Sequence, residues 1–227
     1  MLEITDLIKQ FDQPGGGQLT VLDVPNYSMG PGEQAALIGE SGGGKTTLLH
    51  LIAGLLSANS GSIRVDNLEL TKLSEAGRDR FRAATIGYVF QTFNLLPAFS
   101  ALENVQLGMA FGGRRVDPNR AAELLDRVGL ADRADYRPSQ LSVGQQQRVA
   151  IARSLAGQPK LLLADEPTAN VDPASADSVL DLILQACRDE NISLLMVTHS
   201  LEVAGRFERV DRLEEINRAF AIQSQKV

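Results

Sequence analysis

Short apolar runs alternate along the chain with longer stretches in which apolar residues recur every three or four positions. The runs 35–38, 160–164 and 192–197 are apolar almost throughout, which is typical of strands buried on both faces of a sheet. Between the last two runs, apolar residues lie on one face of a predicted helix: Val179, Leu182, Ile183, Ala186 and Cys187. Strands that alternate with helices indicate an α/β protein whose mainly parallel sheet is covered on both faces.

Weaker patterns place the remaining elements. The stretch 2–39 mixes short β-type runs with turn residues, and the glycines at 15–17 predict a loop tip. A helix is predicted over 46–56, and 61–66 is typical of one half of a hairpin. The segment 93–156 is rich in helical patterns and in arginine. The sequence shows no internal repeat, heptad run or long linker, and its length suits one large α/β domain or two small ones.

Composition then narrows the class of protein. The 227 residues are 44% hydrophobic and 22% charged, as in globular domains rather than disordered chains. Acidic residues outnumber basic ones by 28 to 22, which argues against nucleic acid or anionic lipid as a partner. Cys187 is the single cysteine, so no intrachain disulfide is expected. No apolar run reaches the roughly 18 residues of a membrane span, and no signal peptide is recognisable, so the cytoplasm is the expected location.

One motif carries specific chemistry. Residues 39–46, Gly-Glu-Ser-Gly-Gly-Gly-Lys-Thr, match the phosphate-loop pattern G-x-x-x-x-G-K-[ST] between a predicted buried strand and a predicted helix. Glycines let backbone N–H groups turn toward an anion, and the helix N-terminus adds its positive dipole end. Lys45 is predicted to contact the β- and γ-phosphates, and the Thr46 hydroxyl to ligate Mg²⁺. Guanine is disfavoured because the chain has no Asn-Lys-x-Asp motif.

A second motif supplies carboxylates to the same site. The apolar run 161–164 ends in Asp165 and Glu166, and Asp165 is expected to hold Mg²⁺ directly or through water. Neighbouring strand residues point to opposite faces, so Glu166 is not expected to duplicate this role. At the strand end Glu166 is predicted to polarise the attacking water as general base. The simpler alternative is two solvated acids at a strand end.

The order of the motifs then suggests a family. Residues 141–148, Leu-Ser-Val-Gly-Gln-Gln-Gln-Arg, resemble the signature motif of ABC ATPases and lie between the phosphate loop and the predicted magnesium strand. Gln91, after a predicted strand at 86–90, is similar to the family's Q-loop glutamine. Residues 169–172 resemble its D-loop, and His199 resembles its switch histidine.

This resemblance covers essentially the whole chain and implies a fold. We expect a single ABC ATPase domain over 1–227 of the α/β P-loop NTPase type, with a RecA-like core sheet and flanking helices. An N-terminal antiparallel β-subdomain and the core are expected within 1–90 and 157–227. An inserted α-helical subdomain that carries the signature motif is expected over 91–156.

The resemblance also implies roles for individual residues. The expected catalytic residues are Glu166, His199, Gln91 and Lys45. The expected metal ligands are Thr46, Gln91 and Asp165. Contacts to ATP are expected from an adenine-stacking aromatic residue, the phosphate loop and the signature motif: Phe11, Gly39, Glu40, Ser41, Gly42, Gly43, Gly44, Lys45, Thr46, Thr47, Ser142, Gly144 and Gln145. ATP and Mg²⁺ are therefore the expected cofactors. His50 and Cys187 are interpreted as structural.

The signature motif implies a second copy of the chain. Ser142 and Gly144 precede a predicted helix over 145–155, whose N-terminus would face the γ-phosphate bound by the opposite subunit. The family pattern implies a head-to-tail homodimer that sandwiches two ATP molecules, with Asp172 and Ser142 at its interface. Val143 stands where the family usually has glycine, and a β-branched residue there predicts an altered contact geometry.

A final stretch suggests what the ATPase drives. Residues 90–105 resemble the lipoprotein-releasing and macrolide-export branch, which works with a separate membrane permease, so a peripheral location on the cytoplasmic face of the inner membrane is expected. Four apolar residues either receive that permease or belong to the core of the helical subdomain: Phe93, Leu95, Leu96 and Phe99. One alternative is an ATPase that drives a signalling permease, as in the cell-division pair. The other alternative is a soluble ABC ATPase that acts in DNA repair, on chromosomes or on ribosomes.

Overall fold

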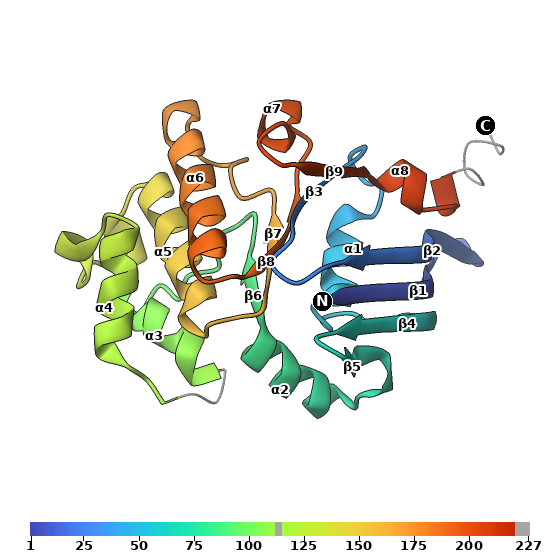
Figure 1. The fold of residues 1–227 in the computed structure, drawn as a ribbon, viewed down its shortest axis with the longest axis horizontal. Coiled ribbons are helices and arrows are strands. Elements are labelled where there is room, and N and C mark those ends of the chain that lie inside the picture. The colour runs from blue at the N-terminus through green and yellow to red at the C-terminus, as the bar shows by residue number, and fades with distance from the viewer. Residues whose placement is uncertain (112–114, 221–227) are drawn as a thin grey trace.

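Two sheets form the scaffold of the computed structural model, which describes residues 1–111 and 115–220. The antiparallel strands are β1 (Leu2–Asp12), β2 (Gln18–Met29), β4 (Ser60–Val65) and β5 (Leu68–Glu69), in the order β2-β1-β4-β5. The parallel strands are β3 (Gln34–Ile38), β6 (Ile86–Val89), β7 (Leu161–Asp165), β8 (Ser193–Val197) and β9 (Arg209–Arg212), in the order β6-β7-β8-β3-β9. The α/β fold with a parallel core sheet and an N-terminal antiparallel sheet is therefore confirmed (Figure 1).

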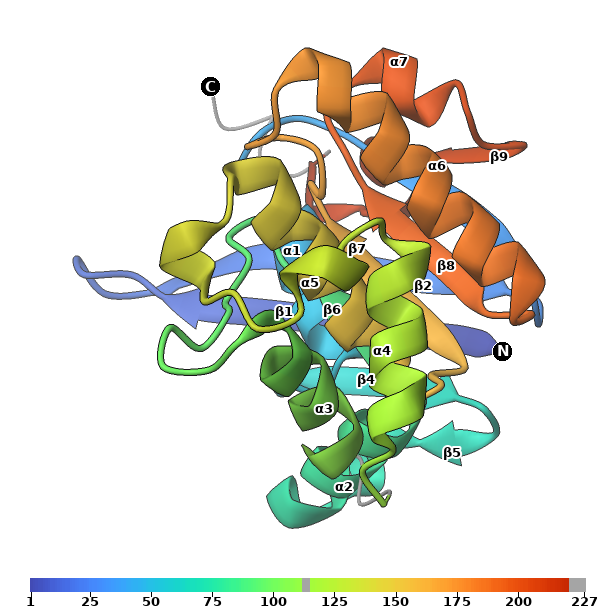
Figure 2. The same cartoon turned by 90° about the vertical axis from the view of Figure 1, so that its left-hand side faces the viewer.

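Helices lie on both sides of the parallel sheet. They are α1 (Lys45–Ile52), α2 (Glu75–Thr85), α3 (Ala101–Phe111), α4 (Pro118–Arg127), α5 (Val143–Ala156), α6 (Pro173–Asp189), α7 (Leu201–Ala204) and α8 (Leu213–Ile216). Short 3₁₀ turns cover Leu70–Lys72, Ala131–Arg133 and Pro138–Gln140. In Figure 2, α3, α4, α5 and α6 stand in front of the parallel strands. Within the described residues, no helix combines the length and the apolar character needed to cross a bilayer.

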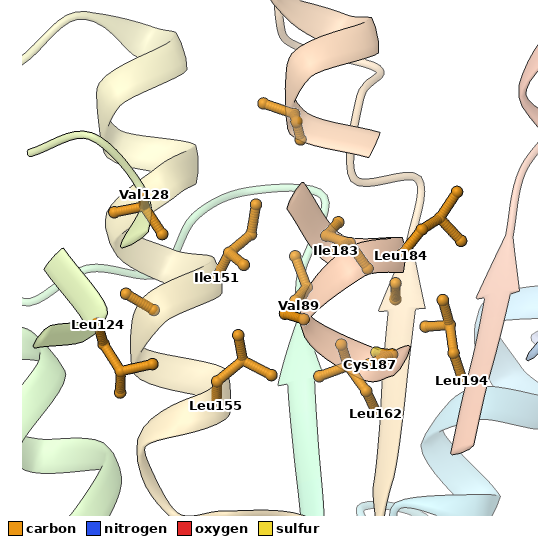
Figure 3. Packing of buried hydrophobic residues seen from close by; sticks show 14 of the residues in the cluster. Val89, Leu124, Val128, Ile151, Leu155, Leu162, Ile183, Leu184, Cys187 and Leu194 are labelled. Carbon is orange, nitrogen blue, oxygen red and sulfur yellow. The ribbon is translucent and has the colours of Figure 1, made fainter. Parts of the chain in front are cut away.

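The strands of the parallel sheet divide their side chains between two hydrophobic cores. Leu161 and Leu163 of β7 pack with α1 and the antiparallel sheet, whereas Leu162 packs with α5 and α6 on the opposite face. Figure 3 shows Leu162 and Leu194 among the side chains of this second cluster. Because successive strand residues point to opposite faces, a wholly apolar run is what a sheet buried on both sides requires.

Cys187 lies in this second cluster on α6. Its side chain is buried, and burial raises the pKa of its thiol to about 12. The thiol is therefore protonated near neutral pH and contributes packing, in agreement with the structural interpretation.

Two predicted helix boundaries were wrong. The helix predicted over 46–56 ends at Ile52, because Gly54 adopts a left-handed φ of 66° and the N–H of Leu55 bonds back to the carbonyl of His50. The helix predicted over 145–155 begins at Val143. The Ser142 hydroxyl caps it by accepting from the Gln145 N–H, and the Gln145 side chain accepts from the Ser142 N–H. Gly144 therefore lies within the first turn of α5 rather than before the helix.

The N-terminal strands are longer than the short runs predicted. β1 and β2 form one antiparallel hairpin, and the predicted loop tip at 15–17 lies at its turn. The buried positions Ile4 and Leu7 are three residues apart because Asp6, with a φ of 47°, interrupts the pairing of β1 with β4. This irregularity breaks the two-residue period that would have indicated a long strand.

Candidate functional site

A cleft of about 350 Å³ opens at the carboxyl ends of the parallel strands, beside the first turn of α1. Its lining consists of Ser41, Gly42, Gly44, Lys45, Thr46, Thr47, Gln91, Asp165, Glu166, Val197 and His199. Open α/β sheets bind ligands at this edge. The structure therefore brings together every residue predicted for catalysis or metal binding, although these residues come from distant parts of the sequence.

The phosphate loop connects β3 to α1 and exposes backbone donors. Gly42 and Gly44 adopt left-handed φ angles of 78° and 102°, which glycine accepts without strain. A Cβ on Gly44 would also lie 3.0 Å from the Val21 side chain. Among residues 1–111 and 115–220, no side chain caps the N-terminus of α1. The first N–H groups of this helix are consequently available to an anion, with the positive end of the helix dipole behind them.

Lys45 folds back over the loop that precedes it. Its ammonium donates to the carbonyls of Gly39 and Glu40, each at 2.8 Å, and the residue is 8% exposed. These bonds hold a positive charge at the mouth of the loop. Gly39, Glu40 and Gly43 belong to the loop backbone but do not line the cleft.

Thr46 and Asp165 meet across the cleft from α1 and β7. The Thr46 hydroxyl lies 3.2 Å from Oδ1 of Asp165, which it can donate to. Burial is the largest effect on Asp165 and raises the pKa of its carboxyl, while the bond from Thr46 and the nearby His50 act in the opposite direction. A buried carboxylate of this kind is stabilised by a cation. His50 does not line the cleft, and its ring lies 6.0 Å from the Tyr88 ring.

Glu166 pairs with His199. It follows the last residue of β7 with a left-handed φ of 48°, an uncommon conformation for a residue other than glycine. Its N–H donates to the Val197 carbonyl at 3.0 Å, and its Oε1 lies 2.8 Å from Nδ1 of His199. The side chain of Glu166 is 13% exposed and that of His199 is 69% exposed. The two carboxylates therefore have different partners, but Glu166 lies beyond the end of β7, so the strand alternation that the prediction assumed does not apply to it.

Gln91 reaches the same cleft from the loop after β6. Its backbone carbonyl accepts a hydrogen bond of 2.9 Å from Nδ2 of Asn170. Asn170 lies in the segment between Glu166 and Asp172. The loop that carries Gln91 is therefore tied to the segment that follows β7.

Other predicted residues lie outside this cleft. Phe11, on β1, is 39% exposed and has Lys9 Nζ 4.8 Å from its ring centroid, but it does not line the cleft. Ser142, Gly144 and Gln145 form the N-terminus of α5, where a Cβ on Gly144 would lie 3.7 Å from Ser175 of α6. One chain does not bring these residues to its own phosphate loop.

Asp172 has a structural role that the sequence did not indicate. Its carboxylate caps α6 by accepting from the Ser175 N–H at 3.0 Å. An N-cap aspartate satisfies an otherwise unpaired helix donor and favours the dipole. A place at a dimer interface remains a prediction for this residue.

Two further residues touch the site and were not predicted. Glu214 of α8 accepts from the Glu40 N–H at 2.8 Å, and a Cβ on Gly39 would lie 2.8 Å from the same carboxylate. Gln147 of α5 is fully buried and donates to the Pro167 carbonyl, directly after Glu166, at 2.7 Å. A polar residue at a buried helical position was a signal for Gln147, whereas nothing in the sequence distinguishes Glu214 from other surface acids.

Comparisons with known proteins agree with this geometry. A family model described as ABC transporter matches residues 22–169. The lipoprotein-releasing system ATP-binding protein LolD of Novosphingobium aromaticivorans is 46% identical over 217 residues, which is 95% of this chain and 96% of the relative. The protein LolD 2 of Caulobacter vibrioides, which has the same description, is 45% identical over 201 residues, or 88% of each chain.

Solved structures show the same fold. The dimeric structure of MJ0796, a bacterial ABC transporter cassette, has a TM-score of 0.86 and 34% identity, covering 93% of this chain and 94% of that one. A second dimeric structure of MJ0796, in a post-hydrolysis state bound to ADP and Pi, has the same values. The resemblance drawn from the sequence motifs is thus confirmed: this chain belongs to the ABC transporter family, as an ATP-binding subunit that hydrolyses ATP.

Proposed function

We propose that the cleft binds ATP together with Mg²⁺ and that Glu166 acts as general base on the attacking water. The observation that carries this proposal is the convergence of the phosphate loop, the Thr46–Asp165 pair and the Glu166–His199 pair in one cleft. Lys45 and the N-terminus of α1 supply positive charge where the β- and γ-phosphates would lie.

The residues present fit a magnesium ion. Mg²⁺ commonly takes one or two protein oxygens and completes its shell with phosphate oxygens and water. The Thr46 hydroxyl and the Asp165 carboxylate supply such a pair, and Gln91, which lines the same cleft, is proposed to supply a further oxygen. The described residues hold no cluster of three or more histidine, cysteine or acidic ligands, so the donor set suits a metal that depends on phosphate oxygens. When bound, Mg²⁺ neutralises charge on the phosphates.

Glu166 and His199 are assigned the hydrolytic step. The oxygen of a water molecule forms a bond to the γ-phosphorus, the bond to the β,γ-bridging oxygen breaks, and ADP leaves. Glu166 accepts the proton that the water loses and later releases it to solvent. The hydrogen bond to His199 fixes the orientation of the Glu166 carboxylate.

Two copies of the chain complete the site. Ser142, Gly144 and Gln145 lie outside the chain's own cleft, which supports the proposal that they contact ATP bound by a partner in a head-to-tail homodimer. MJ0796, which is 34% identical, is described as dimeric. Ser142→Arg is therefore expected to abolish ATP-dependent dimerisation without weakening ATP binding to the monomer. Light scattering with and without ATP measures the first effect, and equilibrium dialysis of labelled ATP measures the second.

The ATPase is proposed to energise a membrane permease of the lipoprotein-release or export type, from the cytoplasmic face of the inner membrane. Relatives at 44–46% identity over most of the chain are described as ATP-binding proteins of a lipoprotein-releasing system. The loop after Gln91 exposes Leu96 and Phe99, at 40% and 38%, on the side of residues 91–156. We assign this loop and the helical subdomain over 91–156 to contact with the permease.

The identity of the permease tests this assignment. The tagged chain would be purified from gently solubilised membranes of its source, and the co-purifying proteins identified by mass spectrometry. The expected partner is a permease with few membrane helices and a large extracytoplasmic domain. A permease with many helices would contradict the branch assignment, and a soluble or nucleic-acid partner would contradict the transporter assignment. A permease that controls wall hydrolases would instead support the signalling alternative.

A further inference from the structure

The loop between β6 and α3 is held in place by side chains from three other segments. Arg153 of α5 donates to the carbonyls of Phe93 and Asn94, at 2.8 and 2.6 Å. Asn104 of α3, fully buried, donates to the carbonyls of Leu96, Phe99 and Ser100 and accepts from the Leu96 N–H. Because these bonds fix successive carbonyls along the loop, the backbone from 93 to 100 should move as one body.

One further hydrogen bond to this loop comes from the segment that follows β7. Asn170 donates to the Gln91 carbonyl at 2.9 Å, and it belongs to the segment that runs from Glu166 to the start of α6. In the described part of the chain, the loop's other side-chain partners belong to α3, to α5 or to the loop itself. The Asn170 bond thus connects the backbone beside the predicted base to the backbone beside the predicted permease contact.

We propose that Asn170 is a positioning residue that makes the loop after Gln91 follow the segment 167–172 when nucleotide binds. This proposal rests on the proposed function, since it assumes that ATP changes the position of that segment. Gln91 takes part in both contacts, because its carbonyl accepts from Asn170 and the residue lines the cleft proposed to bind ATP. A displacement of the segment by ATP or by the second subunit is thereby passed to Phe93 and its neighbours.

The sequence provides a clean reporter for this movement. The chain contains no tryptophan, so Phe93→Trp introduces the only indole fluorophore, at a residue close after Gln91 whose carbonyl accepts from Arg153. The experiment uses the full-length chain with Glu166→Gln, which is expected to bind ATP without turning it over. Tryptophan emission is recorded during titration with ATP and Mg²⁺, and ATP affinity is measured separately with radiolabelled ATP. Phe99→Trp is a second reporter on the same loop.

The test variants are Asn170→Ala, which removes the side chain, and Asn170→Asp, which keeps its shape but not its N–H donor. Asn119, an exposed residue of α4 far along the chain from the cleft, supplies matched Ala and Asp controls. Asn170 is itself exposed, so neither change should unfold the protein, and a circular dichroism melt verifies this.

The expected result is a change of emission on ATP binding that both Asn170 variants reduce at least threefold. ATP affinity stays within twofold of the parent, and the Asn119 variants behave like the parent. An unchanged response in the Asn170 variants would overturn the proposal, as would a parent whose emission at both reporter positions ignores bound ATP. A loss with Asp alone would also overturn it, because it would show charge repulsion rather than a missing hydrogen bond. Failure of the parent to bind ATP would instead contradict the proposed function.

Discussion

Helices α1 and α5 both carry residues at their N-termini that are predicted to contact ATP, but the two N-termini differ in their capping. The N-terminus of α1 follows Gly44 and has no capping side chain. The N-terminus of α5 has a reciprocal cap, in which the Ser142 hydroxyl accepts from the Gln145 N–H and the Gln145 side chain accepts from the Ser142 N–H. Within the described residues, no side chain caps the first donors of α1, whereas the cap of α5 satisfies the N–H groups of Ser142 and Gln145 internally.

This difference suits the N-terminus of α1 to binding a ligand and the N-terminus of α5 to contacting a second chain. Uncapped donors at α1 lower the free energy of bound phosphate in a single chain, where Lys45 and Asp165 complete the site. The capped end of α5 is stable and exposed without a ligand, and Ser142 still has its hydroxyl proton to donate while it accepts from Gln145. We infer that α1 recruits the nucleotide and that α5 senses it only when a second chain approaches.

The largest effect is expected when the general base Glu166 is replaced, which leaves both helix ends intact. Glu166→Gln should lower the ATPase rate by about 100-fold or more, in the range that general bases contribute. ATP binding should persist and dimers should accumulate, since both helix ends are intact. Steady-state phosphate release and gel filtration with ATP measure these effects. Glu202→Gln, an exposed acid on α7, is the control. Wild-type turnover in Glu166→Gln would remove Glu166 from the mechanism.

The next effect tests the α1 end. Lys45→Ala removes two hydrogen bonds to the loop and a charge at its mouth, so the Kd for ATP should rise by about 10- to 100-fold, as expected for bonds to charged groups worth ~1.5–3 kcal/mol. Isothermal titration calorimetry measures this directly. Lys72→Ala, whose side chain is 77% exposed and pairs with Glu69, should leave the Kd unchanged. Equal affinity in both variants would contradict the phosphate contact of Lys45.

A smaller effect tests the α5 end with a matched cap. Ser142→Ala and Ser74→Ala each remove an N-cap serine, from α5 and from α2, so each should lower the free energy of unfolding by ~1 kcal/mol. Only Ser142→Ala should also lower the ATPase rate, by roughly 10-fold, because it removes a hydrogen bond to a charged phosphate as well. Urea denaturation and phosphate release separate the two effects. If both variants lost stability and neither lost activity, α5 would have no role in ATP contact.

The smallest effect concerns the departure from the family pattern at Val143. Val143 is the first residue of α5 and is 47% exposed. Because this position is helical, glycine is not required there, and Val143→Gly should cost up to about 0.5–1 kcal/mol of stability. The ATPase rate should change by less than threefold. A large gain in rate would show instead that the valine side chain obstructs the contact with the second subunit.

The sequence allowed the fold and the composition of the cleft to be predicted, because both depend on short-range patterns. A wholly apolar run such as 161–164 has few alternatives to a doubly buried strand, and its end placed Asp165 and Glu166 together. The order of the motifs predicted which side chains gather at the sheet edge. Their chemical roles stay predictions until the variants above are measured.

What the sequence did not reveal depends on long-range contacts or on backbone conformation. Glu214 reaches the phosphate loop from 174 residues away, and no local pattern selects it. The bond from Asn170 to the Gln91 carbonyl involves a backbone acceptor, which every residue possesses. The left-handed conformation of Glu166 has no sequence signal either, since glycine would be the usual residue there.

The strand order of the parallel sheet has a consequence for synthesis on the ribosome. β3, which leads into the phosphate loop, pairs only with β8 and β9 in the described sheet, and both of these strands are translated long after it. Glu214, which holds the Glu40 N–H, follows them directly. A nascent chain therefore carries its complete phosphate-loop sequence long before it has a partner for the strand that shapes it. We therefore expect nucleotide binding to require that β8 and β9 have been made, and until then β3 is an apolar strand without its sheet partners.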